Sequence, residues 1–140
     1  MLDKKINNMF TEKDKSSFAY WFAHWCAYNM CAINLGCWKF RFLFHDIEKP
    51  WLKLILRDYK KVQKIHRKHA KHHTTYKNIN KIDWLAAVID WESSRFTKPH
   101  GTLTAREEYD RLINVRYKDD KVMCHLLEMN VLPILEKLGL

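Results

Sequence analysis

Residues 18–38, FAYWFAHWCAYNMCAINLGCW, form an uncharged stretch of membrane-spanning length, and this stretch constrains the fold more than any other. Its Trp and Tyr residues are spread along it instead of gathering at two interfaces, and His24, Asn29 and Asn34 interrupt it. We therefore expect a helix inside a small bundle and no membrane span. Because this helix is apolar on nearly every face, we expect it to be central, with His24 and Asn29 finding partners inside the protein.

The chain has only three Gly and three Pro, against 47% hydrophobic and 14% aromatic residues. These numbers leave little material for the tight turns of a β fold, so the sequence predicts an all-α protein. A length of 140 residues predicts a single domain over residues 1–140, a bundle of about five to six helices whose first 15 residues can be flexible. The four cysteines lack zinc or disulfide spacing and the N-terminus lacks a signal peptide, so a cytoplasmic protein is expected.

Glycine and proline divide the first half of the chain into helices. Gly36 is well suited to end the first helix, which a serine at position 16 or 17 can cap. The Lys49-Pro50 pair is expected to end a second helical segment at His45 and Asp46, because the residue before proline avoids helical dihedrals. The expected helices are residues 17–36, residues 37–46, and residue 51 onwards into the segment HRKHAKHHTTY.

Capping residues define the helices of the second half. Asn80 can cap one helix, and Thr104 with Glu107 can form a capping box for the next. Pro133 is expected to kink or interrupt the last helix. The expected helices are residues 81–94, residues 105–117 and a last helix that Asp119 or Asp120 starts and that runs to Leu138, with a loop at 94–104.

Four histidines follow one another in the segment HRKHAKHHTTY. If the third helix continues through this segment, its rotation of 100° per residue brings His66, His69 and His73 into one narrow stripe. The same rotation turns His72 elsewhere. Three imidazoles are therefore expected to face the same site.

A buried histidine, an adjacent His-Asp pair and a later aspartate offer the ligands of a metal site. Side chains one residue apart on a helix diverge by about 100°, so His45 and Asp46 can share an ion only if other helices complete its coordination. His24 is a suitable donor, and Asp90 lies on the border of its helix's buried face, where it can reach between helices. Two imidazoles and two carboxylates suit Mn²⁺, Fe²⁺, Co²⁺, Ni²⁺ or Zn²⁺, as one or two ions.

This order of residues resembles the HD superfamily of metal-dependent phosphohydrolases. The segment HDIEK keeps His45, Asp46 and Lys49 of the family's His-Asp-x-Gly-Lys motif, with Glu48 where Gly usually stands. Glu48 can ligate a metal or hold Lys49. The chain is closest to a little-characterised HD-like branch of bacteria and phages, through HDIEK, HRKHAKHHTTY and the pair DW at 90–91, over about residues 20–95.

The resemblance implies an HD-like bundle that hydrolyses a nucleotide or related phosphoester through a metal-activated water. Asp46, Lys49 and His69 are the expected catalytic residues. With one ion, the histidines of the stripe would bind phosphate or transfer protons; with two, they would hold the second ion. The expected metal ligands are His24, His45, Asp46, His69, His73 and Asp90, and the expected substrate-binding residues are Lys49, His66, His73, Trp91 and Arg95.

Simpler interpretations fit some of these residues one at a time. His24 can be a hydrogen-bonded core histidine, Asp83 can be a carboxylate at a helix N-terminus, and Asp90 can pair with Lys or Arg. The shared metal site is preferred because it explains several such residues together.

Positive charge is concentrated in residues 57–81, which contain nine Lys or Arg and one acidic residue, Asp58. Like charges at helical spacing repel, which favours an anionic partner. The expected partner is a phosphorylated small molecule or an oligonucleotide substrate. The alternative is a non-catalytic basic helical protein that binds nucleic acid or sequesters nucleotides, and a homodimer is compatible with either function.

Overall fold

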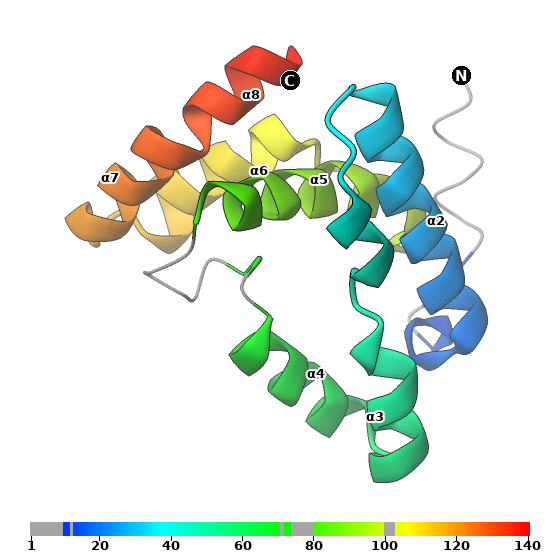
Figure 1. The fold of residues 1–140 in the computed structure, drawn as a ribbon. Helices are drawn as coiled ribbons and strands as arrows, with labels where there is room; N and C mark the ends of the chain where they lie inside the picture. Colours follow the sequence, from blue (N-terminus) through cyan, green and yellow to red (C-terminus); the bar gives the residue numbers. More distant parts are fainter. Residues whose placement is uncertain (1–9, 12, 71, 74–79, 100–102) are drawn as a thin grey trace.

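The computed structural model describes residues 10–11, 13–70, 72–73, 80–99 and 103–140. Regular structure in these ranges is entirely helical, with no strand, which confirms the all-α prediction (Figure 1). The predicted flexible N-terminal segment, 1–15, lies mostly outside the described residues, which omit positions 1–9 and 12. A short 3₁₀ helix, η1 (Asp14–Ser16), leads into the first long helix.

The first long helix, α2, spans Phe18–Asn34. Ser17 caps it by accepting a hydrogen bond from the Tyr20 amide, and Gly36 follows with a φ of 67°, as the sequence predicts. The expectation that this helix is central to the bundle is wrong, because four large apolar side chains on it are 50–64% exposed. They are Phe18, Phe22, Met30 and Ile33.

The His45-Asp46 pair lies in a turn, after the 3₁₀ helix η2 (Phe40–Phe44) and before α3 (Glu48–Leu56). The prediction that Lys49-Pro50 ends a helix is wrong, since both residues belong to the first turn of α3. Proline is tolerated there because an amide in the first turn has no intrahelical acceptor to lose. The His45-Asp46 pair therefore precedes a helix instead of ending one.

The long third helix that the sequence predicts is two helices, α3 and α4 (Tyr59–His69). Arg57 ends α3 in the left-handed conformation, with a φ of 52°. Asp58 then caps α4, its side chain accepting hydrogen bonds from the amides of Lys60 and Lys61. In Figure 1, α3 and α4 form a hairpin that extends away from the C-terminal helices.

The central helix is α5 (Lys81–Thr97), capped as predicted by Asn80. On one side Trp84 and Val88 join the apolar core of the C-terminal helices. On the other side Ala86 and Ile89 pack with Tyr28 of α2. The helix thus separates two apolar clusters and continues past residue 94, where a loop was expected, to Thr97.

The remaining helices follow the sequence closely. α6 (Ala105–Arg111) begins with the predicted capping box of Thr104 and Glu107 and continues into a π-helical turn, Leu112–Arg116. α7 (Lys121–Asn130) is capped by Asp120 and passes into α8 (Leu132–Leu138) at Val131, close to the predicted break at Pro133. Among the described residues, no helix combines the length and the apolar character needed to cross a membrane.

Candidate metal centre

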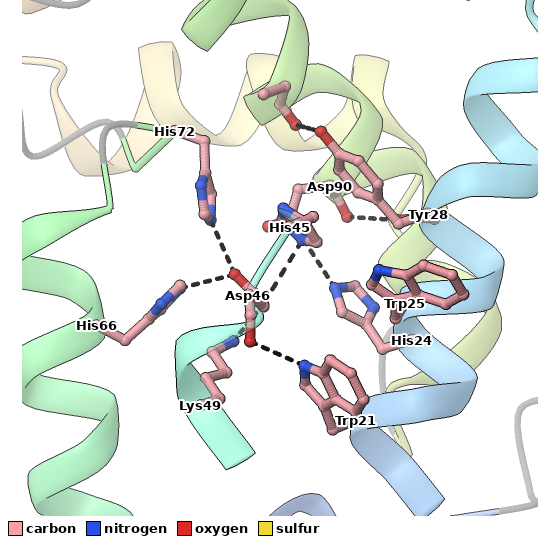
Figure 2. Close-up of polar contacts among 12 residues, drawn as sticks. Trp21, His24, Trp25, Tyr28, His45, Asp46, Lys49, His66, His72 and Asp90 are labelled. Atoms are coloured by element: carbon pink, nitrogen blue, oxygen red, sulfur yellow. Dashed lines mark hydrogen bonds and ion pairs between the residues drawn. The ribbon is translucent and has the colours of Figure 1, made fainter. Parts of the chain in front are cut away.

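The site is built on the turn that carries His45 and Asp46. Asp46 has a φ of 56°, a left-handed conformation that a non-glycine residue adopts at an energetic cost. Two indoles of α2 hold this turn. Trp21 donates to the Asp46 carbonyl at 2.8 Å (Figure 2), and Trp25 donates to the Leu43 carbonyl at 2.8 Å. The aromatic character of α2 therefore serves to fix the backbone of the site.

One group of ligand atoms gathers around the Asp90 carboxylate. Its Oδ1 lies 3.0 Å from His24 Nε2 and 3.2 Å from His45 Nε2, and His45 Nε2 lies 3.5 Å from Asp46 Oδ2. Tyr28 stacks on the His45 ring with centroids 3.7 Å apart and planes inclined by 5°. Side chains from α2, the turn and α5 thus converge, as the sequence predicts for these four residues (Figure 2).

A second group gathers around the other oxygen of Asp46. Its Oδ1 lies 3.2 Å from His66 Nε2 on α4 and 3.5 Å from His72 Nε2, just beyond that helix. The His73 ring lies beside both of these histidines, at centroid distances of 4.8 and 4.4 Å. Glu48 contacts the far nitrogen of His66, Nδ1, and orients the ring toward Asp46.

These atoms are buried and close together, yet several make no hydrogen bond. Five buried side-chain polar atoms lack a hydrogen-bond partner among the described residues, and four belong to this cluster. Such atoms are costly unless something binds them. Donors held about 2.0–2.2 Å from a common ion lie roughly 3 Å apart, which matches the spacings observed, so the residues fit a divalent metal. The four atoms are Asp46 Oδ1 and the Nε2 atoms of His66, His72 and His73.

The two carboxylates of the cluster are ionised. Burial opposes the charge of Asp46, but His45 and Lys49 outweigh it and hold the pKa of Asp46 well below its usual range. Burial also opposes the charge of Asp90, and hydrogen bonds from His24 and His45 lower its pKa in the same way. Two buried negative charges therefore need cationic partners, and Lys49 contacts Asp46 directly.

His72 and His73 of the second group are neutral near pH 7. Burial, with the charge of His45 nearby, lowers the pKa of His72 to about 3. Burial likewise lowers the pKa of His73 to about 4. Neutral imidazole is the form that binds a metal, so no proton has to leave these rings first.

Two cavities lead to the cluster, and Asp46 lines both. One, of about 530 Å³, is lined by His45, His66 and His72 among others. The other, of about 920 Å³, is lined by His24, His73 and Asp90 among others. The buried ligands can therefore be reached by ions and by a substrate.

The His-rich segment differs from its prediction. α4 ends at His69, so a helical stripe cannot extend to residues 72 and 73. His69 is exposed, although it borders the smaller cavity, and it belongs to none of the groups of metal-ligand spacing that the described residues form. His72, expected to point elsewhere, lies beside Asp46. Helical periodicity could not mark His72, because the position of its side chain depends on where α4 stops.

Two predicted substrate-binding residues lie away from the cluster. Arg95 is in the last turn of α5, where its Nε donates to Glu92 at 2.8 Å. Trp91 packs against the C-terminal core and is not among the residues that line either cavity. Asp83 is a carboxylate in the first turn of α5, as expected, and is paired with Arg41 at 2.7 Å.

Comparison of the chain with protein-family models, with curated proteins and with solved structures gives no match in any of the three.

Proposed function

We propose that this protein is a metal-dependent phosphohydrolase, a phosphodiesterase or nucleotidase of the HD type. The observation that carries the proposal is the set of buried ligand atoms around Asp46 that lack hydrogen-bond partners while lying at metal-ligand spacing. A structural His-Asp network would be expected to satisfy these atoms with hydrogen bonds. A divalent cation would satisfy Asp46 Oδ1 and the Nε2 atoms of His66 and His72, and it would also neutralise the buried carboxylates.

Under this proposal, the residues divide between two ions that share Asp46. His24, His45, Asp46 and Asp90 would hold the first ion, and Asp46 with His66 and His72 would hold the second. Three groups of ligand spacing support this division: His24, His45 and Asp46; His66, His72 and His73; and Asp46, Glu48 and His66. Nitrogen and carboxylate donors together favour Mn²⁺, Fe²⁺, Co²⁺, Ni²⁺ or Zn²⁺ over Ca²⁺.

The chemistry would be the hydrolysis of a phosphoester bond. A divalent ion in such a site polarises a phosphoryl oxygen and lowers the pKa of water towards neutrality. Lys49 lies beside Asp46, where its ammonium would stabilise negative charge building on the phosphoryl group. His73 lines the larger cavity together with Asp90 and would transfer a proton at the reacting water.

The test is a hydrolysis screen of tag-free protein, stripped with a chelator and resupplied with each of the five metals. Substrates are bis(4-nitrophenyl) phosphate, mononucleotides, cyclic dinucleotides and short oligonucleotides. We expect hydrolysis only with metal, and a loss of at least about 100-fold in the Asp46→Asn variant. Asp110→Asn, at an exposed position on α6, is the matched control and should keep full activity.

The same screen separates hydrolysis from binding alone. Exposed basic side chains cover α4, including Lys60, Lys64 and Lys68, and they would attract nucleic acid without any chemistry. Binding that survives in Asp46→Asn, with no hydrolysis of any substrate by the wild type, would replace the phosphohydrolase with a basic binding protein.

A further inference from the structure

The larger cavity is a groove that connects the protein surface with the proposed metal ligands around Asp46. Its volume is about 920 Å³, at the upper end of the range for small-molecule sites. Side chains of η1, α2, α3, α4 and α5 line it, so it runs across most of the N-terminal half of the fold. His24, Asp46, His73 and Asp90 lie among its lining residues.

The charge of this groove is arranged for an anion. Its only acidic lining residues among those described are Asp46 and Asp90, the two proposed metal ligands. Six basic residues of the lining outnumber this pair, so the net charge of the lining is positive even without a bound cation. The basic residues of the groove come from η1, α3, α4 and the positions just after α3 and α5. This spread suits several phosphates at separate positions better than one phosphate at a single point. They are Lys15, Lys49, Lys53, Arg57, Arg67 and Lys98.

Two exposed aromatic rings line the groove together with these charges. Trp51 of α3 is 66% exposed and Phe18 of α2 is 64% exposed, and both line the groove. The ring centroids of Phe18 and Trp21 lie 5.3 Å apart, and the Trp21 indole donates a hydrogen bond to the Asp46 carbonyl. Such rings are expensive to leave in water, and a flat base can stack on each of them.

We propose that the groove binds a single-stranded oligonucleotide, with bases on Phe18 and Trp51 and phosphates along the basic side chains. This inference rests on the proposed phosphohydrolase function and names its substrate class. A mononucleotide would leave most of the cations and one of the two aromatic platforms unused. A duplex would hide its bases from the aromatic rings, so single strands are preferred.

The test measures the affinity of metal-free protein for fluorescent oligodeoxynucleotides and oligoribonucleotides of one to eight nucleotides. Affinity should rise with each added nucleotide until the groove is filled, and it should exceed the affinity for a duplex of the same length. Raising the salt concentration should weaken binding, with a log–log slope of about −0.7 for each phosphate contacted.

Two groove variants and two matched controls identify the site. Trp51→Ala should weaken binding about tenfold through the loss of stacking, whereas Phe40→Ala, at a 68% exposed ring outside the groove lining, should not. Arg57→Gln should make the salt slope shallower by about 0.7, whereas Lys121→Gln on α7 should leave it unchanged. Equal effects of groove and control variants would overturn the proposal.

Cleavage separates this inference from the proposed function. Wild-type protein that hydrolyses bis(4-nitrophenyl) phosphate with metal, but binds oligonucleotides no tighter than mononucleotides, would overturn the substrate class and leave the phosphohydrolase intact. Length-dependent binding without metal-dependent cleavage of the bound strands would overturn the assignment of the strand as substrate. Cleavage of single strands that accelerates with length, and slows in Trp51→Ala, would support it.

Discussion

At the scale of single residues, Asp46 combines three demands that few side chains meet. Its backbone is left-handed, its side chain is buried, and its two oxygens face different sets of imidazoles. Asp and Asn tolerate the left-handed region better than other non-glycine residues, because their short side chains bond locally. An aspartate therefore fits both the turn and the proposed metal ions at this position.

The first prediction separates the backbone role of Asp46 from its chemical role. Asp46→Asn should be more stable than Asp46→Ala by about 1 kcal/mol, because Ala pays the left-handed cost without local hydrogen bonds. Asp46→Gly should recover part of that difference, since glycine has no Cβ to strain. Urea unfolding in chelator gives the free energies of unfolding of the three variants. Equal values for Asp46→Asn and Asp46→Ala would contradict the claim that the left-handed backbone at position 46 costs Ala more than Asn.

The second prediction concerns the pH dependence of the metal-free protein. Burial, with His45 and His73 nearby, lowers the pKa of His72 from 6.5 to about 3, against the opposing effect of Asp90 and Asp46. Between these values the unfolded chain binds a proton that the folded chain excludes. The free energy of unfolding should therefore fall as the pH drops from 6.5 towards 3, and this loss should be complete only below both pKa values.

Replacing His72 isolates its share of this dependence. Between pH 6.5 and 4.5, the free energy of unfolding should fall less steeply with falling pH in His72→Gln than in the wild type. The difference in slope should correspond to the binding of up to about one proton per chain on unfolding, as measured by urea unfolding with chelator. His125→Gln, at an exposed position on α7, should follow the wild type. Parallel pH curves for wild type and His72→Gln would show that His72 is as accessible to protons in the folded chain as in the unfolded one.

At the scale of elements, the break between α3 and α4 decides the shape of the site. The sequence pattern predicts one long helix, because apolar spacing continues across residues 51–65. The one acidic residue of that basic region, Asp58, instead caps a second helix and turns the chain back. The hairpin brings His66 of α4 against Glu48 in the first turn of α3, a contact that a continuous helix could not make.

The third prediction follows from that contact between helices. Glu48 binds His66 Nδ1 and thereby aims Nε2 at Asp46, the arrangement in which a carboxylate orients a metal-binding imidazole. Glu48→Gln should weaken metal affinity by about tenfold, and Glu48→Ala by more, as measured by competition with a fluorescent chelator. The exposed Glu136 of α8 supplies the control, Glu136→Gln. Unchanged affinity in both Glu48 variants would remove Glu48 from the site.

At the scale of the whole molecule, local signals predicted the helices and long-range packing decided the rest. Ser17, Asn80, Thr104 and Asp120 cap helices where expected, because capping depends on nearby residues. The sequence could not predict that α5 is central and that one face of α2 is exposed, since both depend on which helices meet. The proximity of four residues was predicted correctly, from the resemblance and from ligand chemistry instead of from helical periodicity. They are His24, His45, Asp46 and Asp90.

Metal binding should stabilise the whole fold, because the proposed ligands come from α2, the His45-Asp46 turn, α4 and α5. An ion at 100 times its dissociation constant should add about 2.7 kcal/mol to the free energy of unfolding. For a chain of this size, that corresponds to a rise in melting temperature of roughly 10 °C. Thermal unfolding with and without Mn²⁺ measures this fourth prediction, and an unchanged melting temperature would count against a site that joins these elements.

The most direct test of the metal centre is the number of ions that tag-free protein retains after equilibrium dialysis against Mn²⁺. The wild type should hold one or two ions per chain, and the Asp46→Asn, Asp90→Asn double variant should hold fewer while remaining helical by circular dichroism. Equal retention by the two proteins, or none by the wild type, would contradict the metal centre proposed for this cluster.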